Sequence, residues 1–357
     1  MQADARAAKH RGGAGASGAV VDRVLVVGLG SIGRRHARVA RLVRPRLRVA
    51  AWRHRRSDEQ LPVDVAEAVW SLDDALAFAP HVAVIASPAS HHLDSARALA
   101  DAGVHLLIEK PIASNSTGVA ELIATCAQRG LVLMTGYNLR FLPSLNQFRT
   151  LLMDGVIGRI LSVRAEAGQY LPDWRPDADY RQSVSARSEL GGGVLLELSH
   201  EFDYLQWILG DVCWVHGHTS RQGELEIDVE DTAHAVLGFA PSRLGDAVVA
   251  SLSLDFVRRD STRTCTAIGT SGSLRWDGIT GELSLFRAGA SAWEVLAVYP
   301  AERDATYVAE WRAFLSAVED GGAVPVTGQD GLAALAVVEA VRESSTSGVR
   351  VFLPAAR

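Results

Sequence analysis

Residues 24–43 carry the pattern that most constrains the fold of this chain. An apolar, β-branched run at residues 24–27 leads directly into Gly28-Leu29-Gly30-Ser31-Ile32-Gly33, and a helical stretch follows at residues 34–43. Strand, glycine-rich turn and helix in this order predict a unit whose helix N-terminus binds a pyrophosphate. A plain glycine turn is the alternative, but the flanking strand and helix favour phosphate binding.

Each glycine in this turn has a physical role. Gly28 permits the tight turn, Gly30 lets the backbone approach the anion, and Gly33 lets the helix pack closely on the strand. The predicted cofactor contacts in and after the turn are Gly28, Gly30, Ser31, Ile32, Gly33 and Arg34.

The rest of the chain has two successive patterns of predicted secondary structure. Strand candidates at 47–52, 81–86, 104–108 and 131–135 alternate with helix candidates at 72–78, 90–102 and 116–128, which predicts a parallel sheet covered on both faces. Later strand candidates, at 159–169, 214–221, 232–239, 247–256, 263–269 and 282–287, mostly follow one another directly and predict a mostly antiparallel sheet. Further helices are expected at 143–153, 194–209, 307–318 and 331–343. We therefore divide the chain into a disordered tail (1–21), a dinucleotide-binding domain (22–139) and an α+β domain (140–357).

Composition excludes several classes of protein. The 357 residues are 48% hydrophobic and 22% charged, with a net charge of −5, as in a globular enzyme that does not bind nucleic acid. No run of 18 apolar residues is present, so no membrane-spanning segment is predicted. Cys126, Cys213 and Cys265 are far apart, so we expect no disulfide framework, no metal site and a cytoplasmic location.

The residue after the second strand candidate bears on the choice of cofactor. An NAD-preferring site carries Asp or Glu about 20 residues after the glycine turn, but this chain has Arg53, followed by His54. A guanidinium suits the 2′-phosphate of NADP through charge-assisted hydrogen bonds. We expect NADP, in contact with Arg53 and His54. The alternative is NAD, with Asp58 or Glu59 bonded to the ribose.

One lysine stands out at a strand end. Of the 36 basic residues, only Lys9 and Lys110 are lysines, and Lys110 lies in Glu109-Lys110-Pro111, directly after the strand candidate at 104–108. The carboxyl ends of parallel strands line the ligand crevice. Lysine, unlike arginine, is a compact donor that can release its proton. We predict that Lys110 is catalytic and that Glu109 and Lys110 line the cofactor site; a remaining surface lysine is the alternative.

A second strand-end loop begins with Ser87 and Pro88, after the strand candidate at 81–86. By the same argument we expect both residues beside the nicotinamide ribose. His91 and His92 are adjacent and face different ways. We assign His92 to the cofactor site and expect the other histidine to be solvated.

A histidine flanked by carboxylates lies in the predicted helix at 194–209. On a continuous helix Glu197, His200 and Tyr204 share one face, and Asp203 lies nearby. A lone histidine is most often a core or surface residue, whereas carboxylates one turn away suit an oriented general base. We predict that His200 and Glu197 are catalytic.

The loop at residues 170–190 is rich in aromatic and arginine side chains. These suit a sugar ring with an anionic group, and an ordinary polar loop is an equal alternative. The predicted substrate contacts, in this loop and elsewhere, are Tyr137, Asn138, Arg140, Trp174, Tyr180, Arg181 and Asp203.

Three motifs together point to a known family: the glycine turn with Arg34-Arg35-His36, Glu109-Lys110-Pro111, and Gly192-Gly193 leading to His200 and Asp203. With these, the chain resembles the glucose–fructose oxidoreductase / inositol dehydrogenase / MocA-like (Gfo/Idh/MocA) family from about residue 23 to 353. The resemblance implies an α/β Rossmann domain followed by an α+β domain with a large open, mostly antiparallel sheet, often as a homodimer or homotetramer. Two positions depart from the family pattern: Ala89 replaces an Asn, and Leu196 stands where the helix carboxylate is usual, with Glu197 next to it.

The resemblance also implies an activity. It is NAD(P)-dependent hydride transfer at a secondary alcohol or ketone of a sugar, free or linked to a nucleotide or phosphate. Lys110 would bond the reacting hydroxyl and His200 would exchange its proton. Two alternatives stay open: a non-catalytic protein that senses NADP, and a protein that uses the cofactor transiently for sugar hydrolysis or elimination. Neither nucleic acid nor a membrane is an expected partner.

Overall fold

The computed structural model describes residues 20–54, 56 and 60–354. The tail expected at residues 1–21 therefore lies outside the described residues, except for Val20 and Val21, and so do Asp58 and Glu59. Val21 is buried, and its N–H donates to Glu319 Oε1 at 2.7 Å. The first domain is thus anchored to the C-terminal part of the chain even before its first strand.

The first domain is the predicted parallel sheet between helices. Within the described residues its strands stand in the order β3-β2-β1-β4-β5-β6, all parallel. The elements are β1 (Arg23–Val27), α1 (Ser31–Val43), β2 (Arg48–Trp52), β3 (Glu67–Val69), α2 (Leu72–Ala77), β4 (Val82–Ile85), α3 (His92–Asp101), β5 (His105–Glu109), α4 (Val119–Gln128) and β6 (Leu133–Gly136). The strand order reverses between β1 and β4, which is where such sheets bind ligands.

The second domain is built on one large sheet, also as predicted. Among the described residues its order is β14-β13-β12-β11-β7-β10-β9-β8-β15, and β7 pairs with β10 in parallel while the other neighbours are antiparallel. The strands are β7 (Ile160–Gly168), β8 (Val212–Ser220), β9 (Thr232–Phe239), β10 (Val249–Asp255), β11 (Thr262–Gly269), β12 (Gly272–Asp277), β13 (Glu282–Arg287), β14 (Glu294–Val298) and β15 (Val351–Phe352). The helices are α5 (Pro143–Met153), α6 (Val194–Glu197), α7 (His200–Leu209), α8 (Ala305–Asp320) and α9 (Gly328–Ser347).

Several elements differ from the prediction. The helix expected at 194–209 is broken at Leu198, whose φ of −100° and ψ of 30° leave the helical region, so that His200 begins a new helix. The loop at 170–190 contains short 3₁₀ turns, and short 3₁₀ helices also lie at Ala89–His91 and Asn138–Phe141. Strands β3, β12 and β14 were not predicted. No helix in the described part of the chain is both long and apolar enough to cross a membrane.

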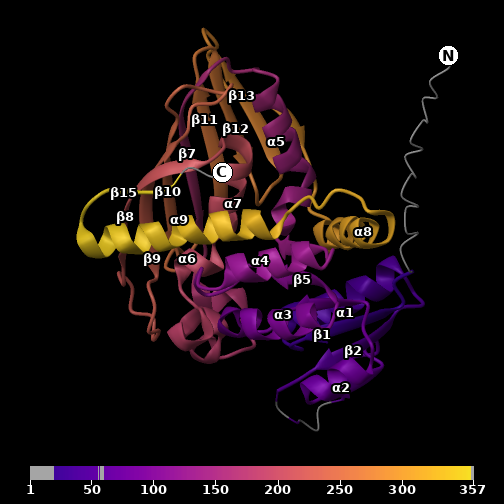
Figure 1. The fold of residues 1–357 in the computed structure, drawn as a ribbon. Coiled ribbons are helices and arrows are strands. Elements are labelled where there is room, and N and C mark those ends of the chain that lie inside the picture. Colours follow the sequence, from indigo (N-terminus) through magenta and orange to yellow (C-terminus); the bar gives the residue numbers. More distant parts are fainter. Residues whose placement is uncertain (1–19, 55, 57–59, 355–357) are drawn as a thin grey trace, which may run out of the picture.

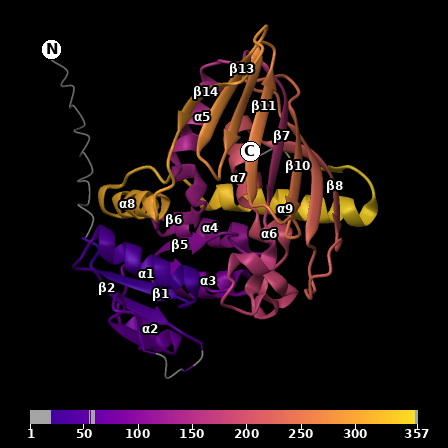
Figure 2. The same cartoon turned by 180° about the vertical axis from the view of Figure 1, so that it is seen from behind.

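The two C-terminal helices return to the first domain. Helix α8 packs beside α1, and α9 lies across the boundary between the large sheet and the first domain, in contact with β8 and β6 (Figures 1 and 2). The main-chain N–H of Thr135 in β6 donates to Val326 O at 3.0 Å, just before α9. Helices α8 and α9 therefore complete the packing of the first domain.

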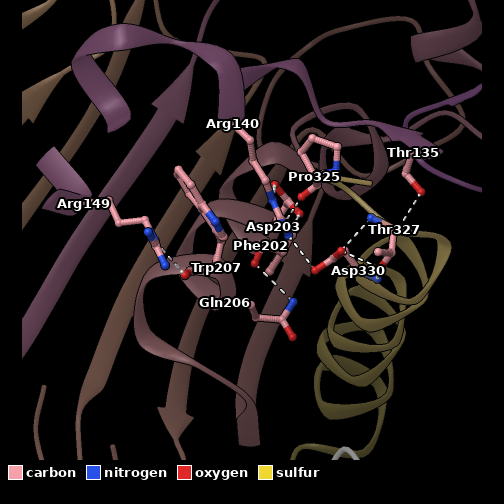
Figure 3. Close-up of polar contacts among 10 residues, drawn as sticks. All are labelled: Thr135, Arg140, Arg149, Phe202, Asp203, Gln206, Trp207, Pro325, Thr327 and Asp330. Carbon is pink, nitrogen blue, oxygen red and sulfur yellow. Dashed lines mark hydrogen bonds and ion pairs between the residues drawn. The ribbon is translucent and has the colours of Figure 1, made fainter. Parts of the chain in front are cut away.

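A buried ion pair joins three segments at this boundary (Figure 3). Arg140 donates to both carboxylate oxygens of Asp203 in α7, at 2.6 and 3.0 Å, and to Asp330 at the start of α9 at 3.0 Å. The side chains of Arg140 and Asp203 are 6% and 1% exposed. Burial raises the pKa of Asp203 to about 6 although Arg140 opposes the shift, so the pair is ionised at neutral pH.

Removing one partner of this pair should destabilise the fold strongly. We expect Arg140→Met to lower the free energy of unfolding by about 3 kcal/mol at pH 7, because the Asp203 carboxylate would stay buried without its counter-charge. The control is Asp246→Asn, which breaks the exposed pair of Asp246 with Arg159 and should change stability little. Urea unfolding followed by fluorescence measures the free energy of unfolding of both variants. Equally small losses of stability in the two variants would contradict the expectation.

Candidate active site

The glycine turn forms the cradle that the sequence predicted. Gly28 has φ +88°, and a Cβ there would lie 2.8 Å from Ala86 O; a Cβ on Gly33 would lie 2.0 Å from Gly28 O. A Cβ on Gly30 would meet nothing within 4 Å, because Gly30 faces open space at the start of α1. These positions fit a pyrophosphate at a helix N-terminus, where N–H groups and the helix dipole favour an anion.

A cavity of about 490 Å³ lies in front of this turn, large enough for much of a cofactor. It contains most of the predicted cofactor contacts. The predicted residues that line it are Gly28, Gly30, Ser31, Ile32, Ser87, Pro88, His92, Glu109, Lys110 and Glu197.

His92 holds the two strand-end loops together. One ring nitrogen lies 2.7 Å from Ser87 O and the other 3.0 Å from Pro111 O. Burial lowers the pKa of His92, although both carbonyl contacts oppose the shift. His92 thus fixes the walls of the cavity, and its neighbour His91 is exposed, as expected.

Lys110 and Glu197 bring the two domains together at the cavity wall. Lys110 Nζ donates to Glu197 O at 2.7 Å and lies 3.8 Å from Glu197 Oε2. Each side chain is 18% exposed. The ammonium therefore has protein partners on one side and keeps access to the cavity, where it can donate to a ligand oxygen.

His200 is a neutral imidazole close to this ammonium. Burial, followed by the charges of Lys110 and Arg263, lowers the pKa of His200 well below its usual value. The ring of Tyr137 packs against it edge-on at 5.5 Å, and Nδ1 is buried without a hydrogen-bond partner among the described residues. His200 is not among the residues that line the cavity.

The carboxylates predicted to orient His200 have other partners. The Glu197 carboxylate contacts Lys110, and Asp203 is paired with Arg140. Glu201, which was not part of the prediction, bonds Arg263 at 2.8 Å. The break at Leu198 is the cause, because Glu197, His200 and Tyr204 no longer share one helix face. Tyr204 lies fully buried in the core.

The residues predicted to select the cofactor lie beside the turn rather than on the cavity wall. The N–H of Gly28 donates to Trp52 O at 2.9 Å, and Arg53 follows directly. The Arg53 guanidinium lies over the ring of Trp70, 5.6 Å from its centroid. His54 lies 5.8 Å from Trp52 and 6.2 Å from His91, measured between ring centroids.

The aromatic residues of the 170–190 loop line a second cavity of about 310 Å³. Trp174 and Tyr180 bound it, and Arg175 and Ser185 line both this cavity and the larger one. The two cavities therefore adjoin. Arg181 instead forms ion pairs with Asp179 at 2.8 Å and Glu226 at 3.2 Å.

The other predicted substrate residues lie in buried positions. Tyr137 is fully buried against His200, and Asn138 Nδ2 donates to Thr306 Oγ1 at 3.0 Å. Arg140 and Asp203 form the pair described above. None of these four lines either of the two cavities.

Sequence reasoning missed several cavity residues. Arg35 lines the larger cavity in place of the predicted Arg34, and its guanidinium lies 5.0 Å from the centroid of the Tyr307 ring. Tyr307 also lines that cavity but comes from α8, far along the chain. The pair Arg34-Arg35 and the arginine-rich loop that holds Arg175 were visible signals, whereas nothing local marked Tyr307 or Ser185.

Two family models match the chain. Residues 23–137 match the NAD-binding Rossmann fold of an oxidoreductase family, and residues 149–353 match the C-terminal alpha/beta domain of the same family. These matched ranges coincide with the two sheets.

Named relatives and solved structures agree with these matches. The chain is 27% identical to 1,5-anhydro-D-fructose reductase of Ensifer adhaerens, over 72% of this chain and 75% of that protein. It is 25% identical to myo-inositol 2-dehydrogenase of Thermotoga maritima, over 90% and 96% respectively. The crystal structure of GenD2 from gentamicin A biosynthesis, in complex with NAD, superposes with a TM-score of 0.77 at 27% identity, over 98% of this chain and 100% of that chain.

A buried acid behind the cavity gives a test of the site's electrostatics. Glu310 in α8 is fully buried, and neither carboxyl oxygen finds a hydrogen-bond partner within the described ranges. Burial, and then the charge of Glu109, raises the pKa of Glu310 well above its usual range. Glu310 is therefore protonated beside an ionised Glu109.

We expect Glu310→Gln to gain stability relative to the wild type as pH rises. Below the unfolded-state pKa of about 4.3, Glu310 of the wild type holds its proton in both the folded and the unfolded state. Above that pH only the unfolded state releases the proton. The wild type therefore loses about 1.4 kcal/mol of stability per pH unit until the folded-state pKa is reached. Urea unfolding at pH 5, 6.5 and 8 measures the gap between the proteins. The exposed Glu343 provides the control Glu343→Gln. The expectation would be contradicted if the stability difference between Glu310→Gln and the wild type varied with pH as little as it does for this control.

Proposed function

Because the chain belongs to the glucose–fructose oxidoreductase, inositol dehydrogenase and MocA (Gfo/Idh/MocA) oxidoreductase family, we propose that it transfers a hydride between NADP and a secondary alcohol or ketone of a sugar. The observation that carries the proposal is the Lys110 ammonium. It lies on the wall of the larger cavity, held from behind by the carbonyl of Glu197 at 2.7 Å. A nucleotide-sensing protein would need the glycine turn but no such donor facing the cavity.

The cofactor would lie against the glycine turn and the strand-end loops. Gly28, Gly30 and the first N–H groups of α1 would bind its pyrophosphate, and Ser87 and Pro88 would flank its nicotinamide end. The nicotinamide ring supplies the hydride chemistry when it is bound. Arg35 and Arg175, which line the same cavity, add positive charge for the phosphates.

Lys110 and His200 would handle the proton and the charge on the reacting oxygen. The ammonium donates a hydrogen bond to that oxygen and stabilises negative charge on it. His200 is neutral because burial and the nearby Lys110 charge disfavour its protonated form, so it can accept the hydroxyl proton in oxidation and return it in reduction. Glu197 would act on Lys110, which it contacts, rather than on His200.

A sugar fits the adjoining cavity. Trp174 Nε1–H donates to Gln169 O at 3.2 Å and Tyr180 Oη accepts from the Glu226 N–H at 3.2 Å, so these contacts hold the rings within the loop. Aromatic side chains bury the apolar faces of ligands, and Arg175 offers a donor fork to hydroxyls or to an anionic group. The names of the relatives, a reductase of anhydrofructose and a dehydrogenase of inositol, support this class of substrate.

The preference for NADP rests on Arg53. It follows β2 directly, beside the glycine turn, at the position where an acidic residue would bond a ribose hydroxyl. The Trp70 ring lies under the guanidinium and helps to hold it at the ribose end of the site.

Replacing Lys110 tests the proposed chemistry. We expect Lys110→Arg to lower the hydride-transfer rate by at least about a hundredfold, because the larger guanidinium cannot take the place of the ammonium between Glu197 and the substrate oxygen. The dissociation constant for NADP should change less than about threefold. Stopped-flow absorbance at 340 nm measures the rate and fluorescence titration measures the constant. Lys9→Arg makes the same change at the other lysine and should leave both unchanged; an equally small effect of Lys110→Arg would rule out its catalytic role.

Replacing Arg53 tests the cofactor preference. We expect Arg53→Asp to weaken NADP binding by about 1.5–3 kcal/mol through loss of a charged hydrogen bond, while NAD binding changes little. Arg48→Asp, at the other end of β2, is the control because Arg48 pairs with Glu67 on the surface. Calorimetric titration with NADP and with NAD measures both dissociation constants. If the wild type binds NAD as tightly as NADP, the assignment of Arg53 to the 2′-phosphate is refuted.

A further inference from the structure

His36 lies in a fully buried polar contact behind the larger cavity. Its Nε2 is 2.7 Å from Glu109 Oε1, and its Nδ1 is 3.1 Å from Trp311 Nε1. His36 and Trp311 are both 0% exposed. An indole N–H can only donate, so His36 Nδ1 accepts this hydrogen bond. The ring hydrogen therefore sits on Nε2 and is donated to Glu109.

Glu109 connects His36 to the backbone of Lys110. Its second oxygen, Oε2, accepts the main-chain N–H of Lys110 at 3.1 Å. The neighbouring strand leaves room for the carboxylate because residue 136 is a glycine. A Cβ at this position would lie only 3.2 Å from Oε2. Burial opposes the charged form of Glu109, but the His36 hydrogen bond and the charges around it outweigh burial and lower the pKa of Glu109. An ionised carboxylate thus binds His36 with one oxygen and the backbone of Lys110 with the other.

We propose that Trp311, His36 and Glu109 form a positioning relay that fixes the backbone of Lys110 and so aims its ammonium at the substrate oxygen. The relay runs from α8 through α1 to the end of β5. It rests on the proposed function, because it assigns the three residues to the presentation of Lys110. His36 and Trp311 do not line the cavity, so they act through Glu109.

The relay makes a specific demand on the tautomer of His36. Glu109 on β5 lies 2.7 Å from His36 Nε2, and Lys110 helps to lower the pKa of Glu109. Tyr307 and Trp311 on α8 also face His36, with ring centroids 5.6 and 6.1 Å from that of His36. Trp311 keeps a donor pointed at Nδ1 and so holds the ring hydrogen on Nε2. Without that donor the ring hydrogen can move to Nδ1, and Glu109 then loses its hydrogen bond.

The first arm of the test compares two tryptophans. Trp311→Phe should lower the hydride-transfer rate roughly tenfold to a hundredfold. Trp276→Phe is the matched control, because Trp276 is also 0% exposed and donates one indole hydrogen bond, to Ser144 at 2.9 Å. It should lose similar stability and keep the wild-type rate. Equal rate losses in both variants would overturn the relay.

The second arm asks whether His36 acts as the hydrogen-bond donor to Glu109. His36→Gln keeps an N–H donor toward Glu109, whereas His36→Leu removes the donor. The relay predicts that the Gln variant keeps most of the rate and the Leu variant does not. Equal rates for Gln and Leu would contradict it.

The third arm needs no substrate and so separates this proposal from the proposed function. Labelling with [ε-¹³C]lysine gives two side-chain signals, since Lys9 and Lys110 are the only lysines. In Trp311→Phe and His36→Leu we expect the Lys110 signal to move or broaden while Lys9 stays unchanged; in Trp276→Phe and His36→Gln neither signal should move. If wild type transfers no hydride to any sugar, the proposed function fails while this readout still tests the relay. A Lys110 signal identical in all variants would overturn the relay even in an active enzyme.

Discussion

The hydrogen bond from Lys110 Nζ to the carbonyl of Glu197 is the contact on which the site depends. It joins the end of β5 in the first domain to the end of α6 in the second, 87 residues later. A 2.7 Å bond of this kind tolerates little displacement, so the two domains must be held at a fixed distance. The buried Arg140–Asp203 pair, its partly exposed neighbour Asp330 and the helices α8 and α9 provide that restraint. The cavity between the glycine turn and the second domain owes its shape to this fixed arrangement.

The features that sequence predicted best are those that local geometry decides. Gly33 has to be glycine because a Cβ would overlap the carbonyl of Gly28, and the strand before it is an uninterrupted apolar run. The position of Lys110 at a strand end follows from the same alternation of strands and helices. These constraints act within about ten residues, so their spacing can be read directly from the chain.

The features that sequence missed depend on long-range contacts. The segment at 194–209 has no internal glycine or proline to mark its break, yet the break turns Glu197 to Lys110. It also leaves His200 without a carboxylate partner among the residues that the structure describes. Arg140 was expected to bind substrate, but the structure places it with Asp203, 63 residues away. Such pairings are set by how the two domains pack, and so are the contacts of Tyr307 and Trp311 with the first domain.

The dependence of the first domain on the C-terminal helices has a consequence for synthesis on the ribosome. Residues 23–136 contain the whole parallel sheet, but α1 also packs on α8 and β6 bonds the segment before α9. At ordinary translation speeds these partners emerge roughly 10–40 s after β6. During that interval the apolar surfaces of α1 and β6 are uncovered, and the nascent chain is exposed to premature association with its neighbours. The native packing of the dinucleotide-binding domain is therefore completed only after α8 and α9 have left the exit tunnel.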